Sequence, residues 1–335
     1  MTETEAKEKD EDLELDSLPG VGPATKQKLI DAGILNVLDL ATAGPMDISD
    51  AVDVDISKAV ELNSKARKKL VELHRLEPDF ISASDLLKRR QAIDRISTGS
   101  RNLDDLLGGG IETWAMTEFF GEFGTGKSQI CHTLCVMVTQ PHGKGGLDGS
   151  AIYIDTEGTF RPERIAEIAE SRGLKPEEVL SRITVARAYN SAHQELIVRD
   201  LGKVIEANKV KLLILDSAVA HYRAEFVGRG TLAERQQRLN RFMHLLLRTA
   251  EVYNVAVVLT NQVQAAPDSF FGDPTRPTGG HVVAHTSTYR IYLRKAAKNR
   301  IARMVDSPYH PERDVVFMLD EKGVDDPLEE TTRRR

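Results

Sequence analysis

The chain has 335 residues, 41% of them hydrophobic, and a formal net charge of −6. This length and composition exclude a fibrous protein and predict a globular one with two domains. Only two cysteines and no apolar stretch of membrane-spanning length are present, which excludes a disulfide scaffold and a membrane protein and predicts a cytoplasmic one.

The negative charge is concentrated at the N-terminus. Residues 1–16 hold eight acidic residues and only two lysines. Of the totals of 51 acidic and 45 basic residues, 43 of each remain outside this segment, so the rest of the chain is neutral. Net charge therefore does not exclude nucleic acid as a partner. We expect residues 1–14 to form a disordered acidic tail, because they have almost nothing to bury.

The first predicted domain spans residues 15–76 and is helical. Leu18-Pro19-Gly20-Val21-Gly22-Pro23 is followed by a helical pattern over residues 24–32. This order predicts a helix-hairpin-helix, in which backbone amides around Gly20 and Gly22 contact a DNA phosphate. A plain helical-hairpin turn without a ligand is the alternative.

Residues 77–98 form a predicted linker between the domains. Phe80 is a large aromatic residue, and the small Ala83 follows it three positions later. Such a segment, tied to neither domain, is suited to insert its aromatic ring into a pocket on another subunit. Docking of the linker onto its own chain is the alternative.

From residue 99 to residue 335, apolar strand patterns alternate with helical ones. The predicted strands are 115–120, 151–155, 183–186, 211–216 and 255–260. Helices between several of these strands favour a mostly parallel sheet covered on both faces, which is an α/β fold. Three later strands without helices between them predict an antiparallel extension of the sheet: 290–293, 301–305 and 314–319.

Gly121-Glu122-Phe123-Gly124-Thr125-Gly126-Lys127-Ser128 is a complete phosphate-binding loop. It lies between an apolar strand pattern and an apolar helical pattern, which is the context that the loop needs. Its glycines let backbone N–H groups surround a β-phosphate at the positive end of the helix. Lys127 is predicted to contact the β- and γ-phosphates of a nucleoside triphosphate, and Ser128 to bind Mg²⁺. A glycine turn with an incidental lysine is the alternative.

Polar residues end or follow three of the predicted strands. Asp216 is predicted to hold Mg²⁺ through water beside Ser128. Glu157 is our candidate for the base that polarises the attacking water. Asp155 is its rival, or instead orients the turn by hydrogen bonds to backbone groups. Gln262 is suited to contact the γ-phosphate and to couple its presence to the following loop.

The arginine-rich segment 223–241 is a candidate for contact with single-stranded DNA. Gly228-Arg229-Gly230 forms a flexible basic turn beside a helix start, as a groove that follows a nucleic-acid backbone needs. We assign Arg229 and Arg235 to this contact. A solvated helix face explains Arg238 and Arg241 at least as well.

A second candidate for DNA contact is the long segment 263–280. It contains three glycines and two prolines that flank Thr275-Arg276. Segments of this length in compact domains are usually functional or disordered. We therefore predict a mobile loop in which Arg276 and Gly279 contact DNA.

Five motifs together resemble those of the archaeal RadA recombinases, which belong to the RecA family of DNA strand-exchange proteins. They lie at residues 18–23, 121–127, 153–164, 228–236 and 260–263. The resemblance covers the chain from about residue 15 to its C-terminal region. It implies a RecA-like P-loop ATPase core after a helix-hairpin-helix domain. It also implies an ATP-dependent filament on single-stranded DNA that pairs with a homologous duplex and exchanges strands in recombinational repair.

The resemblance also implies roles for individual residues. Phe80 and Ala83 match the polymerisation motif, with Phe80 entering the core of the neighbouring subunit. Arg164 matches a residue that stacks on adenine, and His281 matches one that helps to read the γ-phosphate. The segment Asp306–Pro311 matches a cap that closes over ATP held by the adjacent subunit.

The two segments 226–232 and 263–280 match the DNA-binding loops of the family. The implied cofactors are ATP and Mg²⁺. The implied partners are single-stranded DNA, homologous double-stranded DNA, further copies of the chain and recombination mediator proteins, at the nucleoid of an archaeal cell. Ser128 stands where threonine is commoner, and Trp114 where a polar or small residue is expected. The alternatives are a paralogue that regulates filaments without exchanging strands, and a ring-shaped helicase or signalling ATPase.

Overall fold

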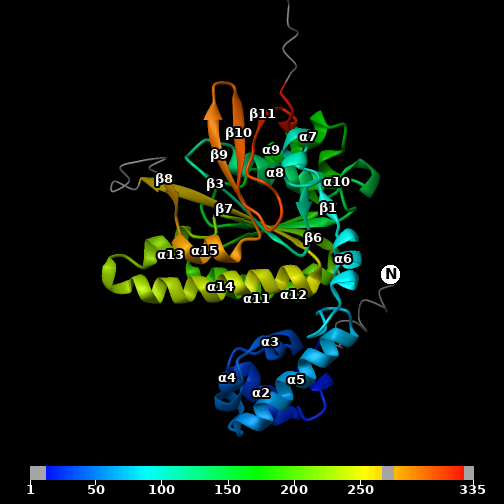
Figure 1. Cartoon of the computed structure of the whole chain (residues 1–335), viewed down its shortest axis with the longest axis vertical. Helices are drawn as coiled ribbons and strands as arrows, with labels where there is room; N and C mark the ends of the chain where they lie inside the picture. The colour runs from blue at the N-terminus through cyan, green and yellow to red at the C-terminus, as the bar shows by residue number, and fades with distance from the viewer. Residues whose placement is uncertain (1–12, 266–274, 328–335) are drawn as a thin grey trace, which may run out of the picture. The chain divides into compact units, whose positions relative to one another are not determined.

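The structure, a computed structural model, describes residues 13–265 and 275–327. The chain divides into two compact units, Met1–Ala92 and Ile93–Arg335 (Figure 1). The division falls inside the segment 77–98 that the sequence predicts as a linker. The predicted acidic tail lies outside the described residues, apart from its last two positions.

Every regular element that the structure describes in the N-terminal unit is a helix, which confirms the predicted small helical domain. Its elements are η1 (Leu15–Ser17), α2 (Pro23–Asp31), α3 (Val37–Thr42), α4 (Pro45–Val52), α5 (Ile56–Glu72) and α6 (Ala83–Gln91). Side chains cap the starts of α3 and α5, where Asn36 accepts a hydrogen bond from the Asp39 amide and Asp55 one from the Lys58 amide. The helices pack around fully buried aliphatic residues: Leu15, Leu29, Leu40, Ile48 and Leu70.

A ten-stranded sheet forms the centre of the C-terminal unit, with nine strands in one row and the tenth, β8 (Thr275–Pro277), paired beside that row. Across the sheet, the order is β12 (Gly323–Asp325), β11 (Asp314–Asp320), β10 (Asn299–Asp306), β9 (Tyr289–Ala296), β3 (Met116–Gly121), β7 (Ala256–Ala265), β6 (Val210–Asp216), β4 (Ser150–Asp155) and β5 (Ile183–Arg187). Neighbouring strands from β9 to β5 are parallel, and those from β9 to β12 are antiparallel. Both the parallel sheet and its antiparallel extension confirm the sequence prediction.

Helices cover both faces of this sheet, and alternating side chains divide between two cores. The helices are α7 (Arg101–Leu106), α8 (Lys127–Met137), α9 (Pro162–Ser171), α10 (Pro176–Leu180), α11 (Ser191–Arg199), α12 (Leu201–Ala207), α13 (Ala220–Glu225), α14 (Leu232–Tyr253) and α15 (Gly280–Thr286). In β6, Leu212 and Ile214 join the core that contains the α8 residues, and Leu213 and Leu215 join the core that contains the α14 residues. This is the two-residue period of a strand buried on both faces. Figure 1 shows α14 crossing one face of the sheet.

The prediction of an irregular loop over residues 263–280 is wrong at both ends of that segment. Strand β7 continues to Ala265, and β8 (Thr275–Pro277) pairs with it in the antiparallel direction. Proline lacks the backbone N–H that donates a hydrogen bond between strands, so its presence argued against a strand here. It is nevertheless tolerated in a strand at the edge of a sheet. Residues 266–274, with Gly272, lie outside the described residues.

Further local elements escaped the sequence prediction. Helix α6 lies inside the predicted linker and begins where the Ser82 hydroxyl accepts a hydrogen bond from the Asp85 amide. Strands β1 (Arg95–Ile96) and β2 (Ile111–Glu112) form a separate two-stranded sheet. After β2, Trp114 adopts φ +60°, a conformation that favours glycine, asparagine and aspartate. That geometry explains why a small or polar residue is expected there.

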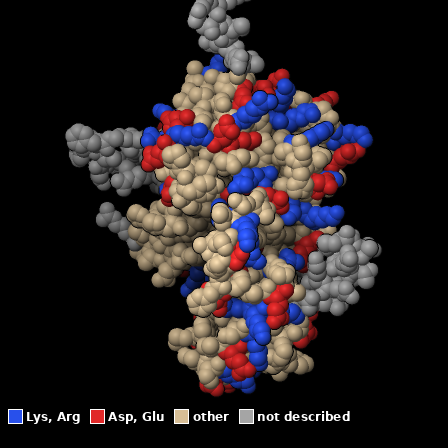
Figure 2. Space-filling model, turned by 45° about the vertical axis from the view of Figure 1, so that its right-hand side comes forward, with Lys and Arg blue, Asp and Glu red and all other residues tan. Residues whose placement is uncertain are grey.

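Within the described part of the chain, no helix combines the length and apolar character needed to cross a bilayer. Basic and acidic side chains are intermixed on the face drawn in Figure 2. The mixture agrees with the near balance of the two charges outside the N-terminal tail.

Candidate nucleotide, DNA and subunit sites

The phosphate-binding loop joins the centre of the sheet to α8. Strand β3 ends at Gly121, between its register partners Gln262 on β7 and Leu293 on β9. A Cβ atom at Gly121 would lie 2.3 Å from the carbonyl oxygen of Leu293, so only glycine fits there. Gly126, at φ +108°, directly precedes α8. The loop therefore follows a path that glycine alone allows at its two ends.

The loop lines a cavity of about 610 Å³, a size typical of small-ligand sites. Every predicted loop residue except Thr125 lines this cavity, together with Glu157, Asp216 and Gln262. Thr125 is buried, and its hydroxyl donates a hydrogen bond to the Glu122 carbonyl oxygen at 2.9 Å. It thus braces the loop from inside.

Lys127 is held across the loop by two carbonyl oxygens. Its ammonium donates hydrogen bonds of 2.9 Å to Gly121 and 2.9 Å to Glu122. Burial lowers the pKa of Lys127, although the nearby carboxylates of Asp216 and Glu157 oppose this shift. A lysine in this position places its charge at the mouth of an anion-binding loop.

Ser128 and Asp216 meet directly. The Ser128 hydroxyl donates a hydrogen bond of 2.6 Å to Oδ2 of Asp216, and the buried Tyr153 hydroxyl donates another of 2.6 Å to the same oxygen. Thr260 donates to the other oxygen of this carboxylate. A hydroxyl beside a carboxylate at a phosphate loop is an all-oxygen donor set that fits Mg²⁺, which keeps several waters and phosphate oxygens as ligands. The described residues contain no group of three or more His, Cys, Asp or Glu side chains placed to hold a metal.

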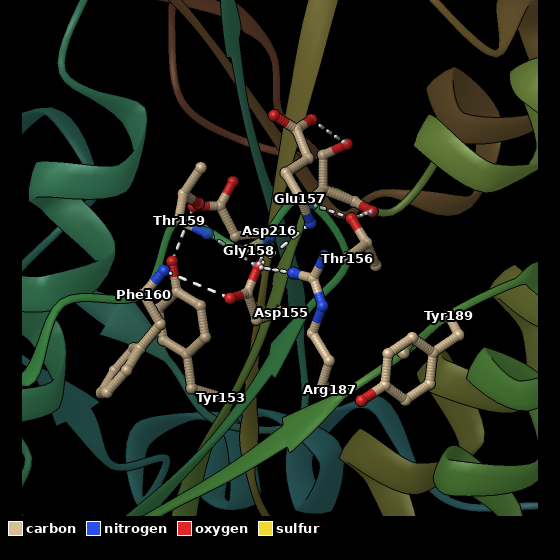
Figure 3. Close-up of polar contacts among 12 residues, drawn as sticks. Tyr153, Asp155, Thr156, Glu157, Gly158, Thr159, Phe160, Arg187, Tyr189 and Asp216 are labelled. Carbon is tan, nitrogen blue, oxygen red and sulfur yellow. Dashed lines mark hydrogen bonds and ion pairs between the residues drawn. The ribbon is translucent and has the colours of Figure 1, made fainter.

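Asp155 organises the turn that carries Glu157 (Figure 3). Its carboxylate accepts hydrogen bonds from the backbone amides of residues 157, 158, 159 and 160, at 3.0, 2.7, 3.2 and 3.2 Å. Arg187 of β5 lies 3.0 Å from the same carboxylate. Of the two roles that the sequence leaves open for Asp155, this geometry matches the orientation of the turn.

Glu157 faces the ends of two neighbouring strands. Its Oε1 accepts a hydrogen bond of 3.1 Å from the Ser217 hydroxyl after β6 and one of 3.3 Å from the Gln262 side chain in β7. Asn261, beside Gln262, donates hydrogen bonds to Glu118 at 2.7 Å and to the Thr278 carbonyl oxygen at 2.6 Å. The Glu157–Gln262 contact is therefore connected, through Asn261, to the residue that follows β8.

Three predicted nucleotide contacts do not line this cavity. The Arg164 guanidinium donates hydrogen bonds to Gln129, at 2.8 Å, and to the backbone of residues 320 and 321. His281 is exposed on α15 and stacks on His285, with 5.8 Å between ring centroids. The segment 306–311 packs by His310 on Tyr289. The chain's own cavity thus lacks a contact from the predicted cap.

The glycine turn of the N-terminal unit is open to solvent. Gly20 adopts φ +100°, and the space around a Cβ at Gly22 is empty to 4 Å. Gly22 precedes α2, whose first residue is Pro23. Lys65 of α5 donates a hydrogen bond of 3.2 Å to the Pro19 carbonyl oxygen. A basic side chain that the hairpin motif did not identify therefore lies beside the turn.

The predicted DNA contacts of the C-terminal unit lie on three elements. Arg229 belongs to η3 (Arg229–Thr231) and Arg276 to β8, but their side chains are outside the described residues. Arg235 is partly exposed on the first turn of α14. Gly279 precedes α15 at φ +89°, where a Cβ would lie 2.6 Å from the Val283 side chain. Packing thus requires a glycine at position 279, whether or not this residue contacts DNA.

Ala83 is the first residue of α6, and Phe80 lies three residues before it. The Phe80 side chain is 95% exposed, and no α6 residue is buried. The Phe80 ring is therefore almost fully open to solvent in this chain.

Comparison with known proteins identifies the family. A family model described as Rad51 matches residues 89–327, more than two thirds of the chain. The chain belongs to the RadA/Rad51 recombinase family. It is 53% identical, over 317 residues, to the DNA repair and recombination protein RadA of Cenarchaeum symbiosum (strain A), covering 94% of this chain and 80% of that protein. A model of the SAM-like helix-hairpin-helix tandem matches residues 12–68, which agrees with the helical N-terminal unit of this RadA/Rad51 recombinase.

Several site residues of this RadA/Rad51 chain were missed by motif reading. Tyr153 contacts Asp216, and Arg187 contacts Asp155. Arg300 of β10 lines the nucleotide cavity. Glu118, buried in β3, forms an ion pair of 2.7 Å with Arg290 of β9. For the Glu118–Arg290 pair the sequence does hold one signal: Glu118 is an acidic residue within an apolar strand pattern, and a buried acid needs a partner.

Proposed function

We propose that this chain is an ATP-dependent recombinase that assembles on single-stranded DNA, pairs it with a homologous duplex and exchanges strands during recombinational repair. We place this activity in the cytoplasm of an archaeal cell, at the nucleoid. The contact between Glu157 and Gln262 carries the proposal, because it joins the nucleotide cavity to the strand that leads into the segment 263–280. ATP binding and DNA binding then share one structural element.

In the proposed ATP hydrolysis, the phosphate loop binds the nucleotide, and residues at the ends of the neighbouring strands orient the attacking water. Lys127 holds the β- and γ-phosphates, while Ser128 and Asp216 hold Mg²⁺, which when bound neutralises charge on the phosphate oxygens. Glu157 accepts the proton of the attacking water. Its hydrogen bonds from Ser217 and Gln262 fix the carboxylate at the cavity wall. Gln262, as a neutral amide, bonds the γ-phosphate and loses that bond after hydrolysis.

A second subunit completes the nucleotide site. The Arg164 guanidinium donates a hydrogen bond to Gln129, which lines the cavity, and this supports the proposed stacking of Arg164 on adenine within the same chain. The segment Asp306–Pro311 does not line the chain's own cavity, which supports its contact with ATP held by a neighbour. His281, which also lies outside the lining, is our proposed reader of the γ-phosphate. ATP is then held at a joint between two subunits.

Phe80 is our proposed subunit link. Strand β5 is at the edge of the sheet and leaves one side without a described partner. Apolar side chains on β5 and in the segment that follows it are exposed: Val185 of β5, Tyr189 after it and Leu196 of α11 are 44, 73 and 53% exposed. An extended segment of a second copy, with Phe80 and Ala83, is suited to pair with this edge and cover these side chains.

DNA contact is assigned to both units. The amides around Gly20 and Gly22 contact a phosphate, and the open space at Gly22 leaves room for it. Arg229, Arg235, Arg276 and Gly279 form the single-strand site on the segments 226–232 and 263–280. Because these contacts are with the backbone, binding is expected to be largely independent of sequence.

A strand-exchange assay with homologous and heterologous duplexes tests the function. We expect ATP-dependent exchange with the homologous duplex only, and loss of exchange in Lys127→Ala, which cannot hold the phosphates. Electron microscopy with ATP and single-stranded DNA is expected to show helical filaments. Filaments without exchange would identify a regulatory paralogue instead, and closed rings that unwind DNA would identify a helicase.

A further inference from the structure

The turn that carries Glu157 is shaped by one carboxylate. Four successive backbone amides, from residue 157 to residue 160, donate to Asp155. Asp155 itself is buried, with 5% of its surface exposed. A buried carboxylate of this kind is stable only while its oxygens are fully bonded and a cation is near. The position of Glu157 thus depends on what stabilises Asp155.

Arg187 supplies this cation from the neighbouring strand. It is the register partner of Asp155 in the parallel pair β4–β5, and its Nη1 lies 3.0 Å from Oδ1 of Asp155. Among the described residues, no other basic side chain forms an ion pair with Asp155. Figure 3 shows the guanidinium directed to the carboxylate.

Arg187 also contacts the turn itself. A Cβ atom at Gly158 would lie 3.0 Å from Nη1 and 3.1 Å from Nη2 of Arg187, so the guanidinium packs directly on this glycine. The residue that precedes Gly158 is Glu157. Arg187 therefore holds the turn in two ways, through the charge of Asp155 and through contact with Gly158.

We propose that Arg187 is a positioning residue for ATP hydrolysis, which fixes Glu157 at the nucleotide through Asp155 and Gly158. The inference rests on the role of Glu157 proposed above. Arg187 does not line the cavity, so its loss is expected to change turnover and to spare nucleotide affinity. Its side chain is 38% exposed at the edge of the sheet, so a substitution leaves the core intact.

The test compares Arg187→Gln with Arg187→Lys and with a matched control, Arg182→Gln. Arg182 forms a surface ion pair of 2.7 Å with Asp148, outside the site. We expect Arg187→Gln to lower kcat on the order of tenfold, since small displacements of a base are costly, with the Kd for ATP within about twofold. Arg187→Lys keeps the cation and is expected to restore most of kcat. Arg182→Gln is expected to match the unsubstituted protein.

Amide hydrogen exchange in the nucleotide-free protein gives a second measurement. Arg187→Gln should speed exchange at residues 157–160, whose amides bond Asp155, and Arg182→Gln should not. Normal kcat in Arg187→Gln, or lowered kcat with unchanged exchange at the turn, would overturn the proposal.

Glu157→Gln, measured in parallel, tests the role of Glu157 as the base separately from the role of Arg187 in positioning it. Loss of hydrolysis in Glu157→Gln with normal turnover in Arg187→Gln would reject the positioning role alone. Retained hydrolysis in Glu157→Gln would reject the proposed base, and with it the role of Arg187.

Discussion

The side-chain amide of Gln262 lies 3.3 Å from Oε1 of Glu157, at the point where β7 passes the phosphate loop. Gln262 is also the register partner of Gly121, the first residue of that loop. One side chain thus lies between the candidate base, the phosphate site and a strand that continues toward the candidate DNA loop. In the proposed mechanism, Gln262 is therefore the residue that links nucleotide state to the candidate DNA loop.

Replacing Gln262 by alanine is expected to uncouple DNA affinity from nucleotide state. The unsubstituted protein should bind single-stranded DNA more tightly with a non-hydrolysable ATP analogue than with ADP, because only the γ-phosphate reaches Gln262. In Gln262→Ala the two affinities should be nearly equal, with ATP still bound. Fluorescence anisotropy of labelled DNA measures both, and Gln27→Ala, on the surface of α2, is the control. If Gln262→Ala kept the full difference in DNA affinity between the ATP analogue and ADP, Gln262 would not be the residue that couples the two sites.

Replacing Phe80 by alanine is expected to shorten the assemblies. Burial of a phenylalanine side chain contributes roughly 1.5 to 3 kcal/mol, so association between subunits should weaken on the order of 10- to 100-fold. Light scattering coupled to size exclusion measures the change. Met46→Ala is the matched control, since Met46 is also apolar and 67% exposed, but lies on α4. Assemblies of full length in Phe80→Ala would refute the interface.

The sequence predicted the central sheet and the phosphate site because both depend on local patterns. The apolar run of β6 and its terminal Asp216 are contiguous, and a parallel sheet brings such strand ends together. Arg187 was not predicted, because its contact with Asp155 depends on the register of β4 and β5, 32 residues apart. The ion pair of Glu118 with Arg290 spans 172 residues and was missed for the same reason.

Turn and edge elements were the other source of error. Pro277 and the glycines after it made the segment 263–280 resemble a loop, yet β8 pairs with β7 there. The pairing is a tertiary effect, because neither strand is stable without its neighbour. Helix α6 did carry a local signal, Ser82 three residues before Asp85, which is typical of a helix start and was overlooked.

Replacing Arg229 by alanine is expected to weaken single-strand binding and to reduce its salt dependence. Each phosphate contact contributes about 0.7 to 1 to the slope of log affinity against log salt concentration, so the slope should fall by about that amount. Arg241→Ala is the control, because Arg241 is exposed further along α14, where a solvated face explains it. An unchanged slope in Arg229→Ala would assign Arg229 a structural role.

A buried histidine is expected to make the C-terminal unit less stable in mild acid. His132 of α8 is 2% exposed and packs on the rings of Tyr153 and Phe160, at 5.7 Å from each. Among the described residues, neither ring nitrogen has a hydrogen-bond partner. Burial lowers the pKa of His132 from 6.5 to about 4. The folded state therefore keeps this ring neutral where the unfolded chain protonates it.

The sign of the effect follows from this difference. Between pH 6.5 and pH 4 the unfolded chain binds one more proton at this residue, so stability falls as pH is lowered. The loss from pH 6.5 to pH 5 is about 1.6 kcal/mol. Urea unfolding followed by fluorescence of Trp114, the single tryptophan, reports on this unit. His132→Phe should lose that part of the pH dependence, and His142→Gln, at an exposed position, should keep it. Equal pH dependence in His132→Phe and the unsubstituted protein would show that His132 is not the titrating group.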